Sequence, residues 1–481
     1  MARFRRLFFL LLTIIPASMC CQTKSLDFPI GMFGVEWSPD KPDGGSMLEQ
    51  LRSTGINVIN CPWYKSSVDH KTNSDVLAFL NKADAAGLRV MLSLNPNENI
   101  AGGVVPVDAN GPHFFTRAYT RLPGDTRKRP DYSDAESMMD FSDSSRAGGT
   151  IKNHPALYGY LLADEPFDTS STRRYQYFVS ASDLQAAYRE LAADGLSRNP
   201  PVGDATHPYL VTLDDYEVQR AGWKWNTRIS PMKLPEGLQN TNDYTGSADI
   251  IINDTYIIHD PDQWRAVLTS KFESLRESQV KSAKHLQYAI MTYDMYHTRW
   301  NDLSELRFEV YSAIVHGAEG IWFYAYDDMY FWDRKEASYK TDDRPRFFTL
   351  HVLPVVRELA QCGTLLNGQV VMCFMHGKPQ NSECYASVNN QNIEYIARKK
   401  GGQTILVVVN MSNKPIEGAE INLNSLPANR NTADLKSARE VFSVVGDSLS
   451  VRLHPISIPQ GILVDNLEPW QTHAYVFGST P

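Results

Sequence analysis

Short apolar runs alternate with longer segments from about residue 29 to about residue 361. The runs are five to seven residues long, which is the usual length of a buried β-strand. Glycines at positions 55, 87 and 320 fit left-handed caps that end a helix before the next strand. The eight predicted strands are Gly31–Glu36, Ile56–Cys61, Arg89–Leu94, Leu157–Ala163, Val202–Thr206, Ala248–Asn253, Leu286–Thr292 and Gly320–Tyr326.

The segments between these strands have the length of helices. Eight strands with helices between them predict an α/β fold, a TIM (β/α)8 barrel that carries insertions. An open, doubly wound sheet is the alternative, and it is disfavoured because no glycine-rich phosphate turn follows the first strand. The insertions, from Asn95 to about Asp134 and from His207 to about Gly246, follow strand ends and would build the catalytic side. The clearest predicted helices are Ser74–Ala86, Arg174–Ala193, Asp262–Lys284 and Leu303–His316.

The spacing changes from about Leu365 onward, where short strands follow one another with turn residues between them. This pattern predicts a small all-β sandwich. The sequence thus predicts a barrel over residues 27–361 and a sandwich over residues 365–481. Packing against the barrel is the expected role of the sandwich, with sugar binding as the alternative. Its predicted strands are Gln403–Asn410, Ala419–Leu423, Glu440–Val445, Ser448–Leu453 and Thr472–Phe477.

The amino terminus has the order of a secretory signal peptide, over residues 1–21. Basic residues at positions 3, 5 and 6 precede the apolar run Leu7 to Ile15, which is too short to span a membrane. We therefore expect export across the inner membrane, to the periplasm, the outer membrane or the exterior. Cys20 or Cys21 resembles the lipid-bearing cysteine of bacterial lipoproteins, although Met19 departs from the small residue usual before it. We therefore expect contact with a membrane only through a lipid anchor at one of these cysteines.

Charge and cysteine usage exclude several kinds of partner. The formal net charge is −8 and no basic run follows the leader, so nucleic acid and anionic lipid are poor partners. Beyond the leader, cysteines stand only at positions 61, 362, 373 and 384, without the spacing of a zinc site. Cys373 and Cys384 either pair or remain free thiols. No histidine pair, nucleophile elbow or phosphate loop appears, so we expect neither metal nor cofactor.

Two adjacent carboxylates end the fourth predicted strand. The run Leu157–Ala163 is apolar without alternation, as in a strand buried on both faces. Asp164 and Glu165 follow it, and Pro166 cannot extend the hydrogen-bond ladder. In a barrel of parallel strands this places the carboxylates at the catalytic end. The alternative is that Asp164 caps a following helix.

This segment resembles the fourth strand of clan A glycoside hydrolases, (β/α)8 barrels in which an Asn-Glu pair ends that strand and Glu is the acid/base. Glu165 matches the acid/base position, and Asp164 stands where the family has Asn. The resemblance implies hydrolysis of a glycosidic bond with retention of configuration. It also implies a C-terminal β-domain like the one predicted after residue 365. Burial and the neighbouring Asp164 would raise the pKa of Glu165 toward neutrality.

The second carboxylate departs from the family pattern. The clan has a Glu at the end of strand seven, whereas the segment here runs from Gln287 to Asp294 without one. Asp294 is the nearest substitute, and a structural loop role is equally open. Asn253-Asp254-Thr255-Tyr256 resembles the Asp-x-Tyr often found after strand six, so Asp254 is the next candidate and Tyr256 a hydrogen-bonding partner. A structural role for Asp254 also stays open.

Aromatic residues cluster where the strands are expected to end. Sugar rings stack their C–H faces on aromatic side chains, while their hydroxyls bind carboxylates and amides. Asp164 and Glu36 are expected to bind hydroxyls. The candidate aromatic positions are Trp37, Trp63, Tyr293, Tyr324 and Tyr326.

These observations predict a glycoside hydrolase that acts on an extracellular oligo- or polysaccharide, with Glu165 and Asp294 as its carboxylate pair. The alternative is a non-catalytic glycan-binding protein that retains the barrel and has lost the carboxylate of strand seven.

Overall fold

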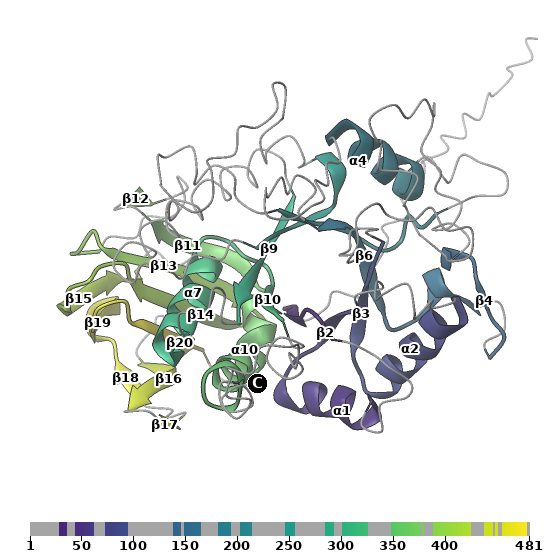
Figure 1. Ribbon diagram of the computed structural model, residues 1–481. Helices are drawn as coiled ribbons and strands as arrows, with labels where there is room; N and C mark the ends of the chain where they lie inside the picture. Colours follow the sequence, from purple (N-terminus) through teal and green to yellow (C-terminus); the bar gives the residue numbers. More distant parts are fainter. Residues whose placement is uncertain are drawn as a thin grey trace, which may run out of the picture.

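Eight parallel strands close into a barrel, which Figure 1 shows roughly along its axis. Around the ring they follow chain order: β1 (Ile30–Met32), β2 (Val58–Cys61), β3 (Arg89–Ser93), β6 (Leu157–Asp164), β7 (Tyr209–Leu213), β8 (Ile250–Asn253), β9 (His285–Met291) and β10 (Ile321–Tyr324). Gly31 pairs with Val58 on one side and with Trp322 on the other, so β1 closes the ring. The predicted TIM barrel is confirmed, and the open sheet is excluded.

The computed structural model describes residues 28–35, 44–61, 73–94, 138–145, 149–164, 181–193, 203–213, 246–254, 284–292, 301–325, 348–375, 378–379, 388–424, 437–445, 448–450 and 455–478. The predicted leader, residues 1–21, and the predicted helix Asp262–Lys284, apart from its last residue, lie outside these ranges.

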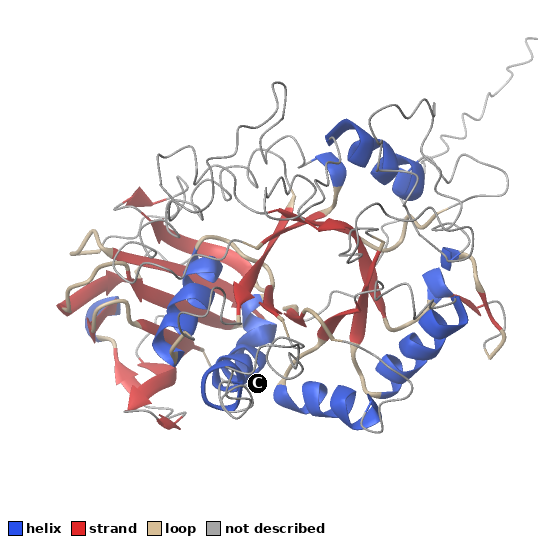
Figure 2. Cartoon of the chain, viewed as in Figure 1, coloured by secondary structure: helices blue, strands red, loops and turns tan. Residues whose placement is uncertain are grey.

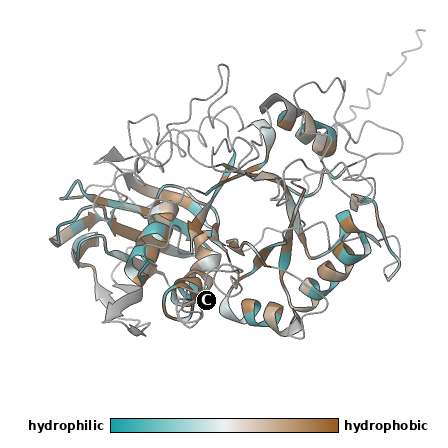
Figure 3. Ribbon diagram, in the orientation of Figure 1, coloured by the Kyte–Doolittle hydropathy of each residue, from teal (hydrophilic) through white to brown (hydrophobic). Residues whose placement is uncertain are grey.

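Helices follow the barrel strands and lie around the ring (Figure 2). Figure 3 shows hydrophobic and hydrophilic stripes on α1 and α2, as expected of helices with one face against the strands. The predicted helices Ser74–Ala86 and Leu303–His316 are confirmed within one residue at each end. The helices are α1 (Gly44–Thr54), α2 (Asn73–Ala85), α4 (Ala181–Tyr188) with the π-helical turn Arg189–Ala193, α7 (Leu303–Val315), and the π-helical turn Phe348–Val352 leading into α10 (Leu353–Leu366).

Helix α7 begins at a capping box. The Asp302 carboxylate accepts the Glu305 N–H at 2.8 Å, and the Glu305 carboxylate accepts the Asp302 N–H at 3.0 Å. This satisfies two backbone donors that the first turn otherwise leaves without partners. Among the helices that the structure describes, none is both long and apolar enough to cross a membrane.

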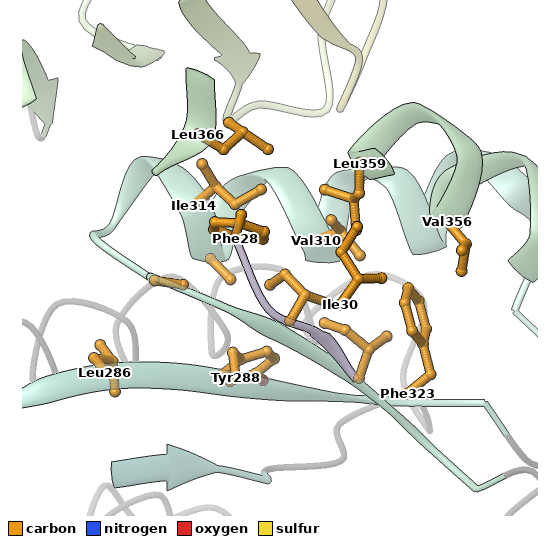
Figure 4. Close-up of a cluster of buried hydrophobic side chains, with 14 of the residues drawn as sticks. Phe28, Ile30, Leu286, Tyr288, Val310, Ile314, Phe323, Val356, Leu359 and Leu366 are labelled. Atoms are coloured by element: carbon orange, nitrogen blue, oxygen red, sulfur yellow. The ribbon is translucent and has the colours of Figure 1, made fainter. Parts of the chain in front are cut away.

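The barrel has two apolar layers, one inside the ring and one between ring and helices. The outer layer, here called the outer cluster, includes strand residues such as Ile30 and Tyr288 packed against Val310 of α7 and Leu359 of α10 (Figure 4). The interior cluster fills the ring, so the barrel is a packed core rather than a pore. It consists of Phe33, Val58, Met91, Tyr158, Leu161, Leu210, Ile250, Ile252, Ala289, Trp322 and Ala325.

The prediction of the fifth strand was wrong in position. Residues 202–206 were expected as a strand, whereas β7 begins at Tyr209. Gly203 has φ +73°. The Asp204 carboxylate accepts a hydrogen bond from the Thr206 N–H at 2.7 Å, which forms an Asx-turn. Such a turn is incompatible with an extended strand. The apolar run Tyr209–Leu213 supplies the strand instead.

The C-terminal part is antiparallel and consists of two sheets, which confirms the predicted sandwich. The smaller sheet pairs β15 (Ile416–Asn422) with β19 (Ile462–Leu467). The predicted strands Gln403–Asn410 and Thr472–Phe477 are confirmed at both ends. The larger sheet has the order β12 (Lys378–Pro379), β11 (Gln369–Met375), β13 (Ile393–Lys400), β14 (Gln403–Asn410), β20 (Thr472–Phe477), β16 (Ser437–Val445) and β17 (Ser448–Ser450), with β18 (Pro455–Ser457) also paired to β16.

Short elements complete the described chain. β4 (Ser142–Asp143) pairs with β5 (Gly149–Thr150), and 3₁₀ turns span Ile151–Asn153 and Pro459–Gly461. The predicted division at residues 361–365 falls in the last turns of α10, and the extents of the two domains stay predictions.

Helices α7 and α10 join the sandwich to the barrel. Arg398 of β13 donates to the carbonyl oxygen of Ala318 at 2.8 Å and to that of Leu366. The Nε2 atom of His316 lies 3.2 Å from a carboxylate oxygen of Glu394, and both side chains are buried. Polar contacts between buried groups thus fix the sandwich on the helices.

Candidate active site

Strand β6 reaches the carboxyl end of the barrel with Asp164, the first of the two adjacent carboxylates in the sequence. Its side chains are buried on both faces: Tyr158 and Leu161 belong to the interior cluster, and Tyr160 and Leu162 to the outer cluster. Asp164 is the last residue of the strand and pairs with Thr212 of β7. Glu165 is the next residue in the sequence and lies outside the described residues. The expected buried strand that ends in a carboxylate is confirmed as far as Asp164.

The other predicted site residues follow described strand ends closely in sequence. Each stands one or two residues in the sequence after a described segment that reaches the carboxyl end of a barrel strand, and each lies outside the described residues. We call the carboxyl ends of the eight strands the barrel mouth. The predicted residues outside the described ranges are Glu36, Trp37, Trp63, Glu165, Tyr256, Tyr293, Asp294 and Tyr326.

Asp254 is the predicted acidic residue whose side chain the structure describes. It directly follows β8, and its N–H reaches the carbonyl oxygen of Leu213 at 3.4 Å, which continues the parallel ladder. Ile252, two residues earlier, belongs to the interior cluster. Because strand side chains alternate between faces, Asp254 lies on the inner side of the mouth, where it is 4% exposed. The structure thus places this candidate at the mouth.

Polar side chains occupy the inner side of the mouth at the ends of four strands, two on each side of β6. Ser93 lies between Leu92 and Leu94, which both belong to the outer cluster, so Ser93 is on the inner side. Asn60 stands two residues after Val58 of the interior cluster, and its Nδ2 donates to the carbonyl oxygen of Met91 at 3.4 Å. The polar arc consists of Asn60 on β2, Ser93 on β3, Thr212 on β7 and Asp254 after β8; β6, which ends in Asp164, runs between β3 and β7.

Aromatic side chains occupy the ends of β10 and β1, which are adjacent in the ring. The Phe33 ring lies 4.9 Å from the Trp322 ring and 5.8 Å from the Tyr324 ring, measured between centroids. Tyr324 is half-buried, whereas Trp322 is fully buried. Tyr324 is one of the aromatic candidates from the sequence analysis, and the structure places it at the mouth. We call Phe33 and Tyr324, on adjacent strand ends, the aromatic arc.

A hydrogen-bonded layer closes the barrel below these arcs. The Trp322 Nε1–H donates to Gln287 Oε1 at 2.7 Å, and the Gln287 amide donates to the Tyr158 hydroxyl at 2.7 Å. Burial raises the pKa of Tyr158 to about 12, so the phenol stays neutral at physiological pH. A ligand therefore has to approach from the mouth rather than pass through the ring. Sequence reasoning missed this layer, because strand periodicity alone does not show which face Gln287 takes.

The arrangement at the mouth is amphipathic. One part of the ring offers amide, hydroxyl and carboxylate groups, and the other offers aromatic faces. Such a surface can bind the C–H face and the hydroxyls of a sugar at the same time. Within the described ranges, no group of three His, Cys, Asp or Glu residues is placed to hold a metal ion.

A second ionisable cluster precedes the amino end of β7 and includes Tyr160 of β6. The Asp204 carboxylate accepts bonds from the Tyr160 hydroxyl at 2.9 Å and from the Thr206 hydroxyl at 2.6 Å, and it lies 2.7 Å from His207 Nδ1. Burial alone would raise the pKa of Asp204, but His207 and the Thr206 donors outweigh it and lower this pKa below its ordinary value. His207, isolated in the sequence, thus has a partner. This end of a barrel usually serves stability.

Comparison with known proteins gives a likeness in fold. No protein-family model and no curated protein sequence matches the chain. A GH30 endoxylanase from Clostridium papyrosolvens is 12% identical with a TM-score of 0.47, over 94% of this chain and 96% of that one. A maltogenic alpha-amylase from Thermotoga neapolitana is 12% identical with a TM-score of 0.46, over 95% of this chain and all of that one. An alpha-amylase from Geobacillus thermoleovorans, complexed with acarbose, is 11% identical with a TM-score of 0.48, over 95% and 99%.

These structural neighbours are glycoside hydrolases, and at such identities the likeness says nothing about substrate or catalytic residues. The strand pairing of this chain independently gives a (β/α)8 barrel followed by a β-sandwich. The chain thus has a (β/α)8 barrel fold, and no protein family is assigned to it.

Proposed function

We propose that the protein is a glycoside hydrolase acting on an extracellular oligo- or polysaccharide, with Glu165 as the acid/base. The observation that carries the proposal is strand β6, which is buried on both faces and delivers Asp164, and with it the start of the Asp164-Glu165-Pro166 sequence, to the barrel mouth. The polar and aromatic arcs on the same mouth support a sugar as the ligand.

The chemistry requires two carboxyl groups with different tasks. Glu165 protonates the oxygen of the leaving group, while a second carboxylate acts as nucleophile or activates water. Asp294, two residues after the segment that ends β9, is the proposed partner, and Asp254 after β8 is the alternative. We propose retention, for which the two carboxyl groups must be about 5–5.5 Å apart; a separation of about 6.5–9.5 Å would give inversion. Proton NMR of the first-formed anomer distinguishes the outcomes.

The variant Glu165→Gln tests the proposal, because an amide cannot protonate the leaving oxygen. We expect kcat to fall by roughly 10²–10⁴-fold, the usual contribution of general acid catalysis, with an unchanged melting temperature. Glu319→Gln is the matched control, since Glu319 is a partly exposed Glu that precedes β10 at the amino end of the barrel. Unchanged turnover in Glu165→Gln, measured as release of reducing ends, would end the assignment.

The cellular location is a proposal that rests on the leader alone. We propose export across the inner membrane, with lipidation at Cys20 or Cys21 as one outcome. Cell fractionation, followed by mass spectrometry of the mature amino terminus, decides between a lipid-anchored, a periplasmic and an extracellular protein.

A non-catalytic glycan-binding protein is the second candidate. One observation favours it: β9 ends at Met291 and is followed by Thr292, without the Glu that clan A enzymes carry there. Isothermal titration with a panel of glycans, run beside a reducing-end assay, separates the two functions. Sugar binding without product release, unchanged by Asp294→Asn, would favour the second candidate.

A further inference from the structure

We propose that the Ser93 hydroxyl is a substrate-binding group, which hydrogen-bonds to a hydroxyl of the sugar unit lying deepest in the barrel mouth. This inference rests on the proposed function and names a contact within that site. Ser93 is a contact to the substrate, with no part in the proton transfers assigned to the carboxylates.

Ser93 is placed where a sugar next to the carboxylates would reach it. It is the last residue of β3, it faces the inside of the mouth, and it pairs with Leu161 of β6. Asp164 stands three residues further along β6, which at about 3.3 Å per residue is at most about 10 Å along the strand. A ligand that contacts Ser93 therefore lies on the strand next to the one that ends in Asp164.

The hydrogen-bonding state of Ser93 points to a ligand. Its residue is 3% exposed, and among the described residues its Oγ has no hydrogen-bond partner. A buried hydroxyl without a partner is unfavourable, so the partner comes from whatever occupies the mouth. Water can serve in the free protein, and a sugar hydroxyl can replace it because it both donates and accepts.

The neighbouring groups fit a neutral sugar. Asn60 on the adjacent strand β2 contributes an amide whose described bond, to the Met91 carbonyl oxygen, is long at 3.4 Å. The half-buried Tyr324 supplies an aromatic surface on the same mouth. Asp254 places a buried carboxyl group on the same ring, which opposes a further negative charge on the ligand. We therefore assign Ser93 to recognition of a neutral, polyhydroxylated ring.

Ser247 provides a matched control within the same barrel. Its side chain is fully buried, and its Oγ also has no hydrogen-bond partner among the described residues. It lies before β8, at the amino end of the ring, whereas Ser93 lies at the carboxyl end of β3. The two serines share chemistry and burial and differ in which end of the barrel they occupy. Removing each hydroxyl therefore separates substrate recognition from folding.

The test compares Ser93→Ala with Ser247→Ala on the oligosaccharide that the wild-type protein cleaves best. We expect Ser93→Ala to lower kcat/KM about tenfold, equivalent to about 1.4 kcal/mol, mainly through KM and with an unchanged pH profile. Ser247→Ala should stay within about twofold of the wild type. Both variants should melt at or above the wild-type temperature, because neither loses a hydrogen bond to a residue that the structure describes. Equal kinetics of the two variants would overturn the inference.

Monodeoxy substrates sharpen the test through a mutant cycle. One deoxy position should lower kcat/KM of the wild type by the same factor as Ser93→Ala, and should cost the Ser93→Ala variant nothing further. Additive losses at every position would refute the contact. If the wild type cleaves none of the glycans, the proposed hydrolase function is refuted, but the Ser93 contact is not yet tested. The affinities of the two variants for the same glycans, measured by calorimetry, then test that contact. Equal affinities, or no binding to any of the proteins, would then reject the contact as well.

Discussion

Replacing Gly31 with alanine tests the packed interior on which the mouth rests. A Cβ at this position would lie 2.1 Å from Cε3 and 2.2 Å from Cδ2 of Trp322. Ordinary carbon contacts are about 3.5–4.0 Å, so the ring would have to move by more than about 1 Å. The Trp322 ring is fully buried and is held by its 2.7 Å bond to Gln287, so it has little room to yield.

The cost can be estimated from these two contacts. Overpacking a core usually costs about 1–3 kcal/mol, and loss of the Trp322–Gln287 hydrogen bond adds about 0.5–1.5 kcal/mol. We therefore expect Gly31→Ala to lower the free energy of unfolding by about 2–4 kcal/mol, and the melting temperature by on the order of 5 °C. Because Trp322 contacts Phe33 of the aromatic arc, sugar affinity should fall as well.

Gly363→Ala is the matched control. Gly363 is inside α10, and the nearest atom that its Cβ would meet is the Cβ of Phe28, at an ordinary 3.8 Å. Alanine in a helix is favoured over glycine by roughly 0.5–1 kcal/mol, so this variant should melt slightly higher than the wild type. Scanning calorimetry of the three proteins decides. A Gly31→Ala variant that melts at or above the wild-type temperature would refute the packing argument.

Two further predictions concern polar groups. The pKa of Asp204 is lowered because the hydrogen bond and charge of His207, with other donors, outweigh the effect of burial. The ionised Asp204 therefore stabilises the folded state fully above the ordinary pKa of 3.8, and this stabilisation is lost as the pH falls through the folded-state pKa. Melting temperatures between pH 7 and pH 2 should fall below about pH 4, and less steeply in Asp204→Asn. Arg398→Leu removes the donors to the carbonyl oxygens of Ala318 and Leu366 and should cost about 2–5 kcal/mol in urea unfolding; a loss below about 0.5 kcal/mol would contradict this role.

The fold was predictable from the sequence because its strands are buried runs that glycines and loops separate. The failure at the fifth strand has a local cause, since the Asp204 side chain closes a turn within the stretch that was expected to be extended. Side-chain turns of this kind depend on a few hydrogen bonds, and apolar periodicity does not register them. The run Tyr209–Leu213 was overlooked because the polar residues before it were assigned to the strand.

The inner surface of the mouth was less predictable, because β6 does not alternate regularly. A bulge shifts its register with β7 between Leu161 and Ala163. Counting every second residue from Leu161 would put Ala163 inside the ring, whereas Ala163 belongs to the outer cluster. A shift of one residue exchanges the two faces of a strand. The pairing of Asp164 with Thr212 is therefore a consequence of the bulge. The sequence shows that an acidic residue ends the strand, but only the strand register shows which residue of β7 it pairs with.

The two ends of the barrel differ in how their polar groups are satisfied. At the amino end, Asp249 accepts the Tyr188 hydroxyl at 2.5 Å and the Tyr209 N–H at 2.9 Å, and Asp204 is bonded as fully. At the mouth, within the described residues, Ser93 has no partner and Asn60 has one long bond.

Polar groups that are already hydrogen-bonded within the protein stabilise the fold and have few donors or acceptors left for a ligand. Polar groups without partners can still form hydrogen bonds to a ligand. Ser247 is the exception at the amino end, where the neighbouring carboxylates of Asp249 and Asp204 already have partners within the protein. The ligand site therefore belongs to the carboxyl end, on an argument from hydrogen bonds that does not depend on the fold's usual polarity.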